Sequence, residues 1–287
     1  MHIGIRDDFQ KVEQLGIREL LNRLRSVFAH ALAFAVISAA ILAAGCGKQS
    51  TGEQIAGPDV AWQRAKNLFA HEHYLKAQQV LKDITLNYPG SAIIDSVQFL
   101  LGRTSFEIGE YLTAADQFHK LVEQYPQSTV GGDAEYWEAR SYYELAPNYQ
   151  LDQDNTNKAV QGFQKFFEDH PQHALTDSAY KYLGLCRDKL AHKVYAAAKL
   201  YYDLDEFASA VLYSDVVLAN YYDTAWADPA QFLKARSFYD LPDWDRARKE
   251  LQTYLDKYPQ GQSAARAKEM LSAADRHANT AVGTVQQ

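Results

Sequence analysis

The chain has 287 residues, of which 47% are hydrophobic and 23% charged, the balance of a folded protein rather than a disordered one. Lysine and arginine total 29 against 36 aspartates and glutamates, a formal charge of −7. This acidic balance argues against nucleic acid as a partner, because its binders need basic stripes that displace counterions. The two cysteines allow at most one disulfide, which excludes a disulfide-stabilised scaffold.

The N-terminal region carries the pattern of a secretory signal. Residues 27–45 are almost entirely apolar, follow Arg23 and Arg25, and end in small residues before Cys46. A basic flank, a short apolar stretch and a small-residue cleavage site are typical of a removed signal peptide, here residues 1–45. The alternative is one uncleaved membrane helix, since about 20 apolar residues can span a bilayer. The small-residue ending before the cysteine favours the signal peptide.

The end of that stretch, Leu42-Ala43-Ala44-Gly45-Cys46, resembles the lipobox of bacterial lipoproteins. The resemblance implies lipidation of Cys46, and Gly47 stands where an aspartate would retain the protein at the inner membrane. It therefore implies a lipid anchor in the outer membrane, facing the periplasm. Ala43 departs from the leucine usual at its position. Residues 46–57 are polar and glycine-containing, which predicts a flexible tether.

The rest of the chain is a repeat array. Five alanines each lie twelve residues before a proline or, once, Tyr222. They are Ala77, Ala114, Ala159, Ala210 and Ala247. In four repeats a small residue lies twelve positions further upstream: Ala65, Gly102, Ala198 and Ala235. In the third it is Ala139, twenty positions upstream, which places an insertion at about residues 146–155.

Paired small residues let two antiparallel helices approach closely, and the proline ends the second helix. The pattern resembles the tetratricopeptide repeat, whose single units cannot bury their own apolar faces. We therefore expect an all-α superhelical solenoid of five helix hairpins. Repeats one to three occupy residues 58–174. Residues 175–276 hold a long helix over Asp177–Leu204, repeats four and five and a capping helix, and residues 277–287 are a predicted disordered tail.

The insertion is acidic and begins like a calcium loop. Asn157 and Phe163 replace the glycine and the glutamate that such a loop requires, so we expect a solvated, mobile segment instead.

The combination of lipobox, tether, five repeats, acidic insertion and long helix resembles the BamD family of lipoproteins from residue 46 to about 275. The resemblance implies a non-catalytic scaffold of the outer-membrane β-barrel assembly machinery. Its implied partners are the periplasmic domains of a BamA-like barrel protein, other lipoproteins of the machinery, and unfolded barrel proteins that end in an aromatic residue. Leu204-Asp205 departs from a basic turn of that family, which implies a different docking contact. The alternative is a periplasmic scaffold for pilus assembly or for cell-wall and envelope constriction.

Equivalent positions of the first helices form a basic column: Lys66, Arg103, Arg140, Lys199 and Arg236. Aromatic residues occupy the columns three before and four after each small residue, among them Trp62, Phe69, Phe106 and Tyr143. Because repeated positions align in a solenoid, we expect a cationic stripe beside two aromatic stripes along the inner curve. The competing interpretation is that the aromatics are core and that the cations pair with acids four residues on, namely Glu107, Glu144, Asp203 and Asp240.

Lys66 has Ala70 instead of an acid at that spacing. An unneutralised cation beside Trp62 and Phe69 suits a peptide's terminal carboxylate and a stacking aromatic side chain. The hypothesis is that the first repeats clamp the C-terminal signals of barrel proteins. The candidate peptide-binding residues are Trp62, Lys66, Phe69, Arg103, Phe106, Arg140 and Tyr143.

The sequence contains no G-x-S-x-G, Walker-type phosphate loop, G-x-G-x-x-G or C-x-x-C motif. His71 and His73 are two apart and point to different faces of a helix, and His170 and His173 flank a helix end, so we expect no metal site. Cys186 fits a core position. We therefore expect neither an enzyme nor a cofactor.

Overall fold

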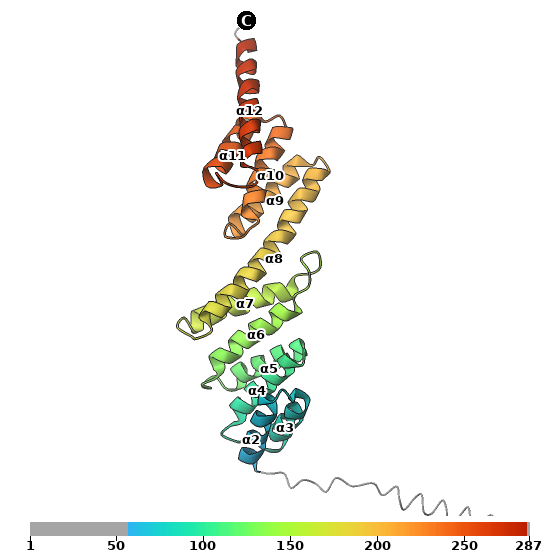
Figure 1. The fold of residues 1–287 in the computed structure, drawn as a ribbon, viewed down its shortest axis with the longest axis vertical. Coiled ribbons are helices and arrows are strands. Elements are labelled where there is room, and N and C mark those ends of the chain that lie inside the picture. The colour runs from blue at the N-terminus through green and yellow to red at the C-terminus, as the bar shows by residue number, and fades with distance from the viewer. Residues whose placement is uncertain (1–56, 286–287) are drawn as a thin grey trace, which may run out of the picture. The chain divides into compact units, whose positions relative to one another are not determined.

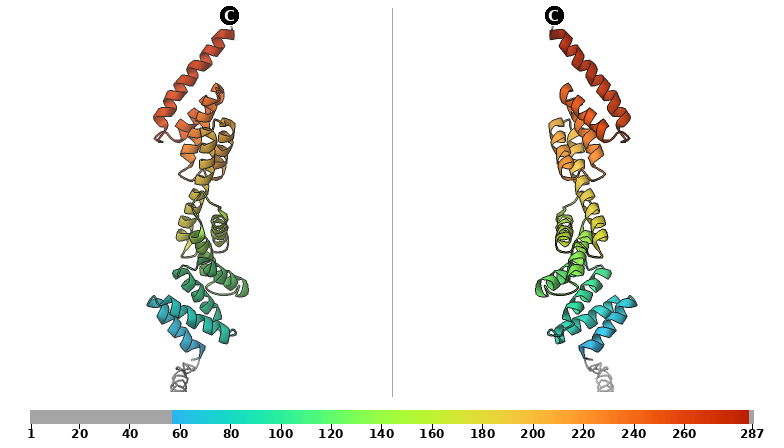
Figure 2. Two further views of the ribbon diagram at one scale, coloured as in Figure 1. Left: turned by 90° about the vertical axis from the view of Figure 1, so that its right-hand side faces the viewer. Right: turned by 90° about the vertical axis from the view of Figure 1, so that its left-hand side faces the viewer.

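The architecture is built from helices alone within residues 57–285, the part of the chain that the computed structural model describes. These residues belong to one compact unit. The helices are α2 (Pro58–Ala70), α3 (Tyr74–Asn87), α4 (Ile94–Glu107), α5 (Tyr111–Gln124), α6 (Gly131–Leu145), α7 (Asp154–Asp169), α8 (Thr176–Asp203), α9 (Phe207–Asn220), α10 (Ala227–Asp240), α11 (Trp244–Lys257) and α12 (Ala264–Val285). They follow one another as stacked hairpins in chain order (Figures 1 and 2). The prediction of an all-α array of five helix hairpins is confirmed.

Proline ends four of the five second helices. In the first repeat, the N–H of Tyr88 donates to the carbonyl of Ile84, and Pro89 then provides no N–H to continue the ladder. The fourth repeat lacks this proline, yet α9 still ends at Asn220. The guanidinium of Arg187 donates to the carbonyl of Asn220 at 2.8 Å, which satisfies one acceptor at the helix end.

The predicted small residues lie where paired helices meet. Nine of the ten are alanines with no exposed surface, and Gly102 is buried as well. Two further columns of each second helix fill the core between hairpins, four and seven residues after its alanine. They are Leu81, Phe118, Phe163, Ser214 and Leu251, and Ile84, Leu121, Phe166, Val217 and Tyr254. The alanine column therefore allows the helices to approach closely, and these two columns supply many of the largest fully buried side chains.

The insertion, predicted to be solvated and mobile, is exposed at Asn148 and at residues 150–152 but also makes defined contacts with α8. Residues 146–153 connect α6 to α7 and lie on α8. The ammonium of Lys189 donates to the carbonyl of Ala146 at 3.1 Å, and that of Lys193 donates to the carbonyl of Leu151 at 2.6 Å. Because these cations come from a helix some forty residues away, the local composition of the insertion gave no sign of them.

The ends of the C-terminal elements test two further expectations. Helix α8 spans 28 residues and so matches the long helix expected over residues 177–204. The capping helix α12 runs to Val285, past its predicted end at residue 276, and the disorder of residues 277–287 stays a prediction. No proline interrupts this segment, and alanines of high helix propensity continue the helix. The predicted signal peptide, Cys46 and residues 46–56 of the tether lie outside the described residues.

Candidate functional site

The predicted peptide-binding residues lie on the first helices α2, α4 and α6. Together with Trp137 and Tyr182 they form what we call the cation–aromatic ladder. Its members are Trp62, Lys66, Phe69, Arg103, Phe106, Trp137, Arg140, Tyr143 and Tyr182. Cations and rings alternate along it instead of forming the separate parallel stripes that we expected. The reason is that each arginine reaches toward rings of the hairpins before and after its own.

Arg103 is the first cation of the ladder that lies between rings of two other helices. Its guanidinium carbon lies 3.7 Å from the ring centroid of Trp137 on α6 and 5.9 Å from that of Phe69 on α2. One terminal nitrogen donates to Glu107 at 2.9 Å. Its Nε is buried without a hydrogen-bond acceptor in the described part of the chain. The cation–π contact with Trp137 therefore positions this side chain more than hydrogen bonding does.

Arg140 repeats the arrangement one hairpin later. Its guanidinium carbon lies 3.9 Å from the ring centroid of Tyr182 on α8 and 5.5 Å from that of Phe106 on α4. It is also paired with Glu144. Burial disfavours its charged form, but the hydrogen bond and charge of Glu144 outweigh this effect and raise the pKa of Arg140. The arginine is thus a fixed cation that is already neutralised by its own helix.

Lys66, at the N-terminal end of the ladder, differs from both arginines. Its ammonium lies 5.3 Å from the ring centroid of Trp62 and is exposed to solvent. Among residues 57–285, no carboxylate lies within ion-pair distance of it, and Leu100 occupies the place in the next hairpin that Trp137 fills for Arg103. Rings of the following helices cover Arg103 and Arg140, but among the described residues no such ring covers Lys66. Its ammonium is therefore accessible to a ligand.

The predicted ion pairs are confirmed along the whole array. Arg103 and Arg140 pair within their helices as described, Lys199 pairs with Asp203 at 2.7 Å, and Arg236 lies 3.8 Å from Asp240. The guanidinium carbon of Arg236 also lies 4.6 Å from the ring centroid of Tyr202 on α8. Both sequence interpretations thus hold in part, because the cations are paired and also stacked on aromatic rings.

Sequence reasoning missed Trp137 and Tyr182, the two closest stacking partners of the arginines. Trp137 lies two residues before the small residue Ala139. The spacing of thirteen residues from Pro126 to Ala139 recurs from Pro171 to Gly184, which places Tyr182 in the same column. Treating residues 177–204 as one long helix hid this repeat. That column holds Leu100 in the second repeat and Leu233 in the fifth, so it gave no consistent aromatic signal.

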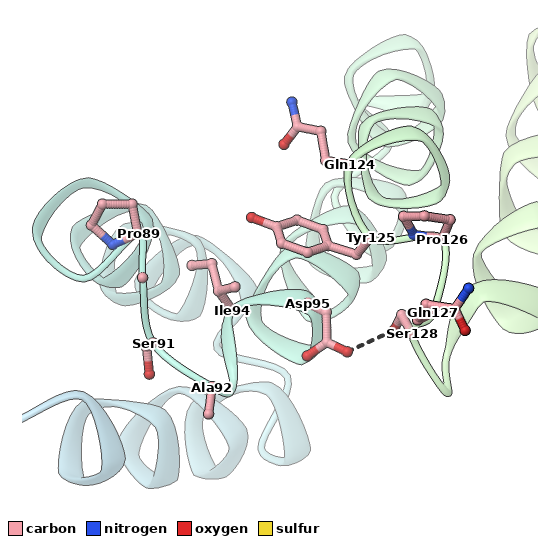
Figure 3. Close-up of a pocket in the computed structure, with 11 residues that line it drawn as sticks. Pro89, Ser91, Ala92, Ile94, Asp95, Gln124, Tyr125, Pro126, Gln127 and Ser128 are labelled. Carbon is pink, nitrogen blue, oxygen red and sulfur yellow. Dashed lines mark hydrogen bonds between the residues drawn. The ribbon is translucent and has the colours of Figure 1, made fainter.

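A pocket of about 540 Å³ lies apart from the ladder, between the α3–α4 and α5–α6 turns. Figure 3 shows the ring of Tyr125 projecting from one turn toward Ile94 at the start of α4. The one charged residue of the lining is Asp95, and its carboxylate already accepts a hydrogen bond from the hydroxyl of Ser128 at 2.7 Å. No residue of the ladder lines this pocket. It offers a ligand mostly apolar walls and no free charge.

The thiol of Cys186 is shielded from reaction. Cys186 is fully buried, and burial raises the pKa of its thiol to about 11, which keeps it protonated. No three His, Cys, Asp or Glu side chains within residues 57–285 are grouped so that they could hold a metal ion. Over the same residues, no helix combines the length and the apolar character that crossing a bilayer requires.

Comparison with known proteins gives one curated relative and several solved structures. The outer membrane protein assembly factor BamD of Rickettsia prowazekii (strain Madrid E) is 23% identical over 228 residues, which cover 78% of this chain and 90% of the relative. The TPR2AB domain of yeast Sti1 in a complex with pHSP90 has a TM-score of 0.41 and 14% identity, covering 80% of this chain and 87% of its own. The MamA protein has a TM-score of 0.37 and 15% identity, covering 71% and 92%.

Two family models match. A tetratricopeptide repeat model matches residues 229–261, and a model described as outer membrane lipoprotein, YfiO, matches residues 56–242. Proteins of these two families are non-catalytic scaffolds. The second match spans well over half of the chain. The chain therefore belongs to the YfiO family of outer membrane lipoproteins.

Proposed function

We propose that the chain is a non-catalytic scaffold lipoprotein of the outer-membrane β-barrel assembly machinery. It is anchored through Cys46 and faces the periplasm, and it receives the C-terminal segments of unfolded barrel proteins on the cation–aromatic ladder. Its family membership and its similarity to an outer membrane protein assembly factor support the assembly role. The single observation that carries the substrate contact is the open cation Lys66.

The ladder suits a peptide that ends in an aromatic residue. A terminal carboxylate needs a cation that no acid of the chain has neutralised, and Lys66 meets this condition where Arg103 and Arg140 do not. The rings of Trp62 and Phe69 lie on the same helix within two turns, so an aromatic side chain can stack beside the carboxylate contact. The paired arginines then continue the surface for residues further from the terminus.

A titration with a peptide ending in phenylalanine tests this contact. We expect the C-terminal amide of the same peptide to bind about tenfold more weakly, because a charge-assisted hydrogen bond contributes about 1.5–3 kcal/mol. The Lys66→Ala variant should bind acid and amide alike. Lys199→Ala is the matched control, since Lys199 is paired with Asp203 and should leave affinity unchanged. Equal affinity of the wild type for acid and amide would overturn the carboxylate contact.

The C-terminal repeats offer a second surface, which we assign to the BamA-like barrel partner. Helix α9 carries one charged residue, Asp215, which pairs with Lys234, whereas each of the other second helices carries three or more. Leu212 on α9 is 63% exposed, and Leu204 at the turn before α9 is 62% exposed. An exposed apolar face on a helix indicates a surface that a partner protein buries. In this proposal, the apolar contact of Leu204 and Leu212 takes the place of the contact that a basic turn would make in the family.

Co-purification from detergent-solubilised membranes separates the proposed function from its alternative. We expect a barrel-sized partner with the wild type and its loss with Leu212→Asp. Leu86→Asp is the matched control, because Leu86 on α3 is 79% exposed but lies outside the proposed contact. Recovery of pilins or wall enzymes instead of a barrel protein would favour pilus assembly or envelope constriction.

A further inference from the structure

The insertion between α6 and α7 does more than connect two helices. Its loop is closed internally by Gln153, whose buried side-chain amide donates to the carbonyls of Asn148 and Leu151 at 2.9 and 3.0 Å. Lys189 and Lys193 of α8 then hold two of its carbonyls, as described above. The insertion is therefore a structured loop held on α8 and not a simple connection between α6 and α7.

The tip of this loop carries an aromatic ring that takes part in a three-membered stack. The rings of Tyr149 and His192 have centroids 3.5 Å apart and planes at 24°. On its other face, His192 stacks on Trp226 with centroids 3.8 Å apart and planes at 13°. We call these three residues the aromatic latch. It joins the insertion, the middle of α8 and the residue before α10.

The position of the latch gives it a mechanical consequence. Within residues 57–285, helices α2–α7 contact one another and α8 but none of helices α9–α12. Helix α8, which Figure 1 shows running from α7 to α9, is thus the helix common to both halves of the array. A connection through one helix leaves bending and twisting about that helix unopposed. The latch adds ring contacts from both halves to one residue of α8, His192, beside the helix axis.

The environment of His192 fits a stacking role. Burial lowers the pKa of His192, an effect that the charge of Asp188 partly opposes, so the ring between Tyr149 and Trp226 is neutral near pH 7. A neutral imidazole between two aromatic rings contributes apolar contact on both faces. The stack of Phe167 on Tyr180, with centroids 4.0 Å apart, joins α7 to α8 within one half and provides a natural comparison.

We propose that the aromatic latch fixes the orientation of the N-terminal half of the array, residues 58–174, relative to repeats four and five. The insertion in the third repeat is the element that makes this possible, because it brings Tyr149 onto the face of His192 opposite Trp226. This inference does not depend on the proposed function, since it concerns only contacts within the chain.

Pulsed electron paramagnetic resonance on the full chain tests the latch. Spin labels attached to keto-bearing amino acids at positions 164 and 260 report on the two halves and leave both cysteines unlabelled. We expect Tyr149→Ala and His192→Ala each to widen the distance distribution at least twofold. His192→Phe, which keeps a stacked ring, should retain the wild-type width. Tyr180→Ala, which removes the comparison stack, should also retain it.

Helicity by circular dichroism separates loosening from unfolding. If His192→Ala loses helicity, the distance distribution of Tyr149→Ala decides the test. The side chain of Tyr149 lies in a loop, so its removal does not disturb a helix. Unchanged widths in a folded Tyr149→Ala variant would overturn the proposal. Equal widening in Tyr180→Ala would overturn it as well, because the effect would then belong to any aromatic contact of α8.

Discussion

Gly102 illustrates how one residue adjusts to its neighbour across a hairpin. Four of the five first helices place alanine at this position, and the second repeat places glycine. A Cβ added to Gly102 would lie 2.7 Å from Cε1 and 2.9 Å from Cδ1 of Phe118, a fully buried ring of α5. The two helices therefore approach as closely as the backbone allows, and the volume that the first helix gives up is filled by Phe118.

We expect Gly102→Ala to lower the free energy of unfolding by about 1–3 kcal/mol, the usual cost of overpacking a rigid site. Gly184→Ala is the control, because Gly184 is exposed in α8 and an added Cβ would meet no atom within 4 Å. That change should raise stability by about 0.5–1 kcal/mol through helix propensity. Urea denaturation monitored by circular dichroism measures both. A stabilising Gly102→Ala would contradict the close approach.

The residues that the sequence could identify are those whose role depends on spacing alone. The paired small residues and the core position of Cys186 follow from helical periodicity, and all are buried as predicted. The choice of glycine at 102 could not be predicted, because it depends on which side chain faces it from another helix. The same holds for Tyr149, whose partner His192 is 43 positions away in the sequence.

At the scale of elements, the ladder connects the first helices of successive hairpins. Arg103 of α4 lies between Phe69 of α2 and Trp137 of α6. Its side chain is 24% exposed, so its contact with Trp137 is partly shielded from water. Lys66, by contrast, lies near the ring of Trp62 on its own helix, and no ring of another helix in the described part of the chain is as close. We therefore assign a structural role to Arg103 and a binding role to Lys66.

We expect Arg103→Lys to lower the free energy of unfolding by about 0.5–2 kcal/mol, because lysine keeps the charge but loses the planar stacking on Trp137. Lys66→Ala should change it by less than about 0.5 kcal/mol, as for most exposed substitutions. Thermal and urea unfolding of the two variants measure the difference. If Lys66→Ala proved the more destabilising change, the two roles would be assigned the wrong way round.

The sequence predicted the columns of the ladder but not how they interleave. Periodicity places Arg140 and Phe106 at fixed positions of their own helices, whereas their contact depends on the offset between successive hairpins. Tyr182 lay outside the columns that the sequence analysis assigned, because residues 177–204 were treated as one long helix. The length of α12 was also missed, since composition at a chain end says little about where a helix stops.

At the scale of the whole described unit, the core is divided along the array. One buried cluster joins α2, α3 and α4, another joins α6, α7 and α8, and another joins α10, α11 and α12. Each draws on consecutive helices only. Stability in such an array is a sum of local terms between neighbours, so a defect at one end is not felt directly at the other.

Leu81 and Leu251 allow a matched test of this locality, because both are fully buried and both lie four residues after the alanine of a second helix. We expect Leu81→Ala and Leu251→Ala each to cost about 2–5 kcal/mol locally, by loss of apolar contact and creation of a cavity. Hydrogen exchange read by mass spectrometry should show protection falling in α2–α4 for the first variant and in α10–α12 for the second. Each variant should leave the opposite end as protected as in the wild type. Equal loss of protection throughout both variants would mean that the array unfolds as one cooperative unit, which its neighbour-only packing argues against.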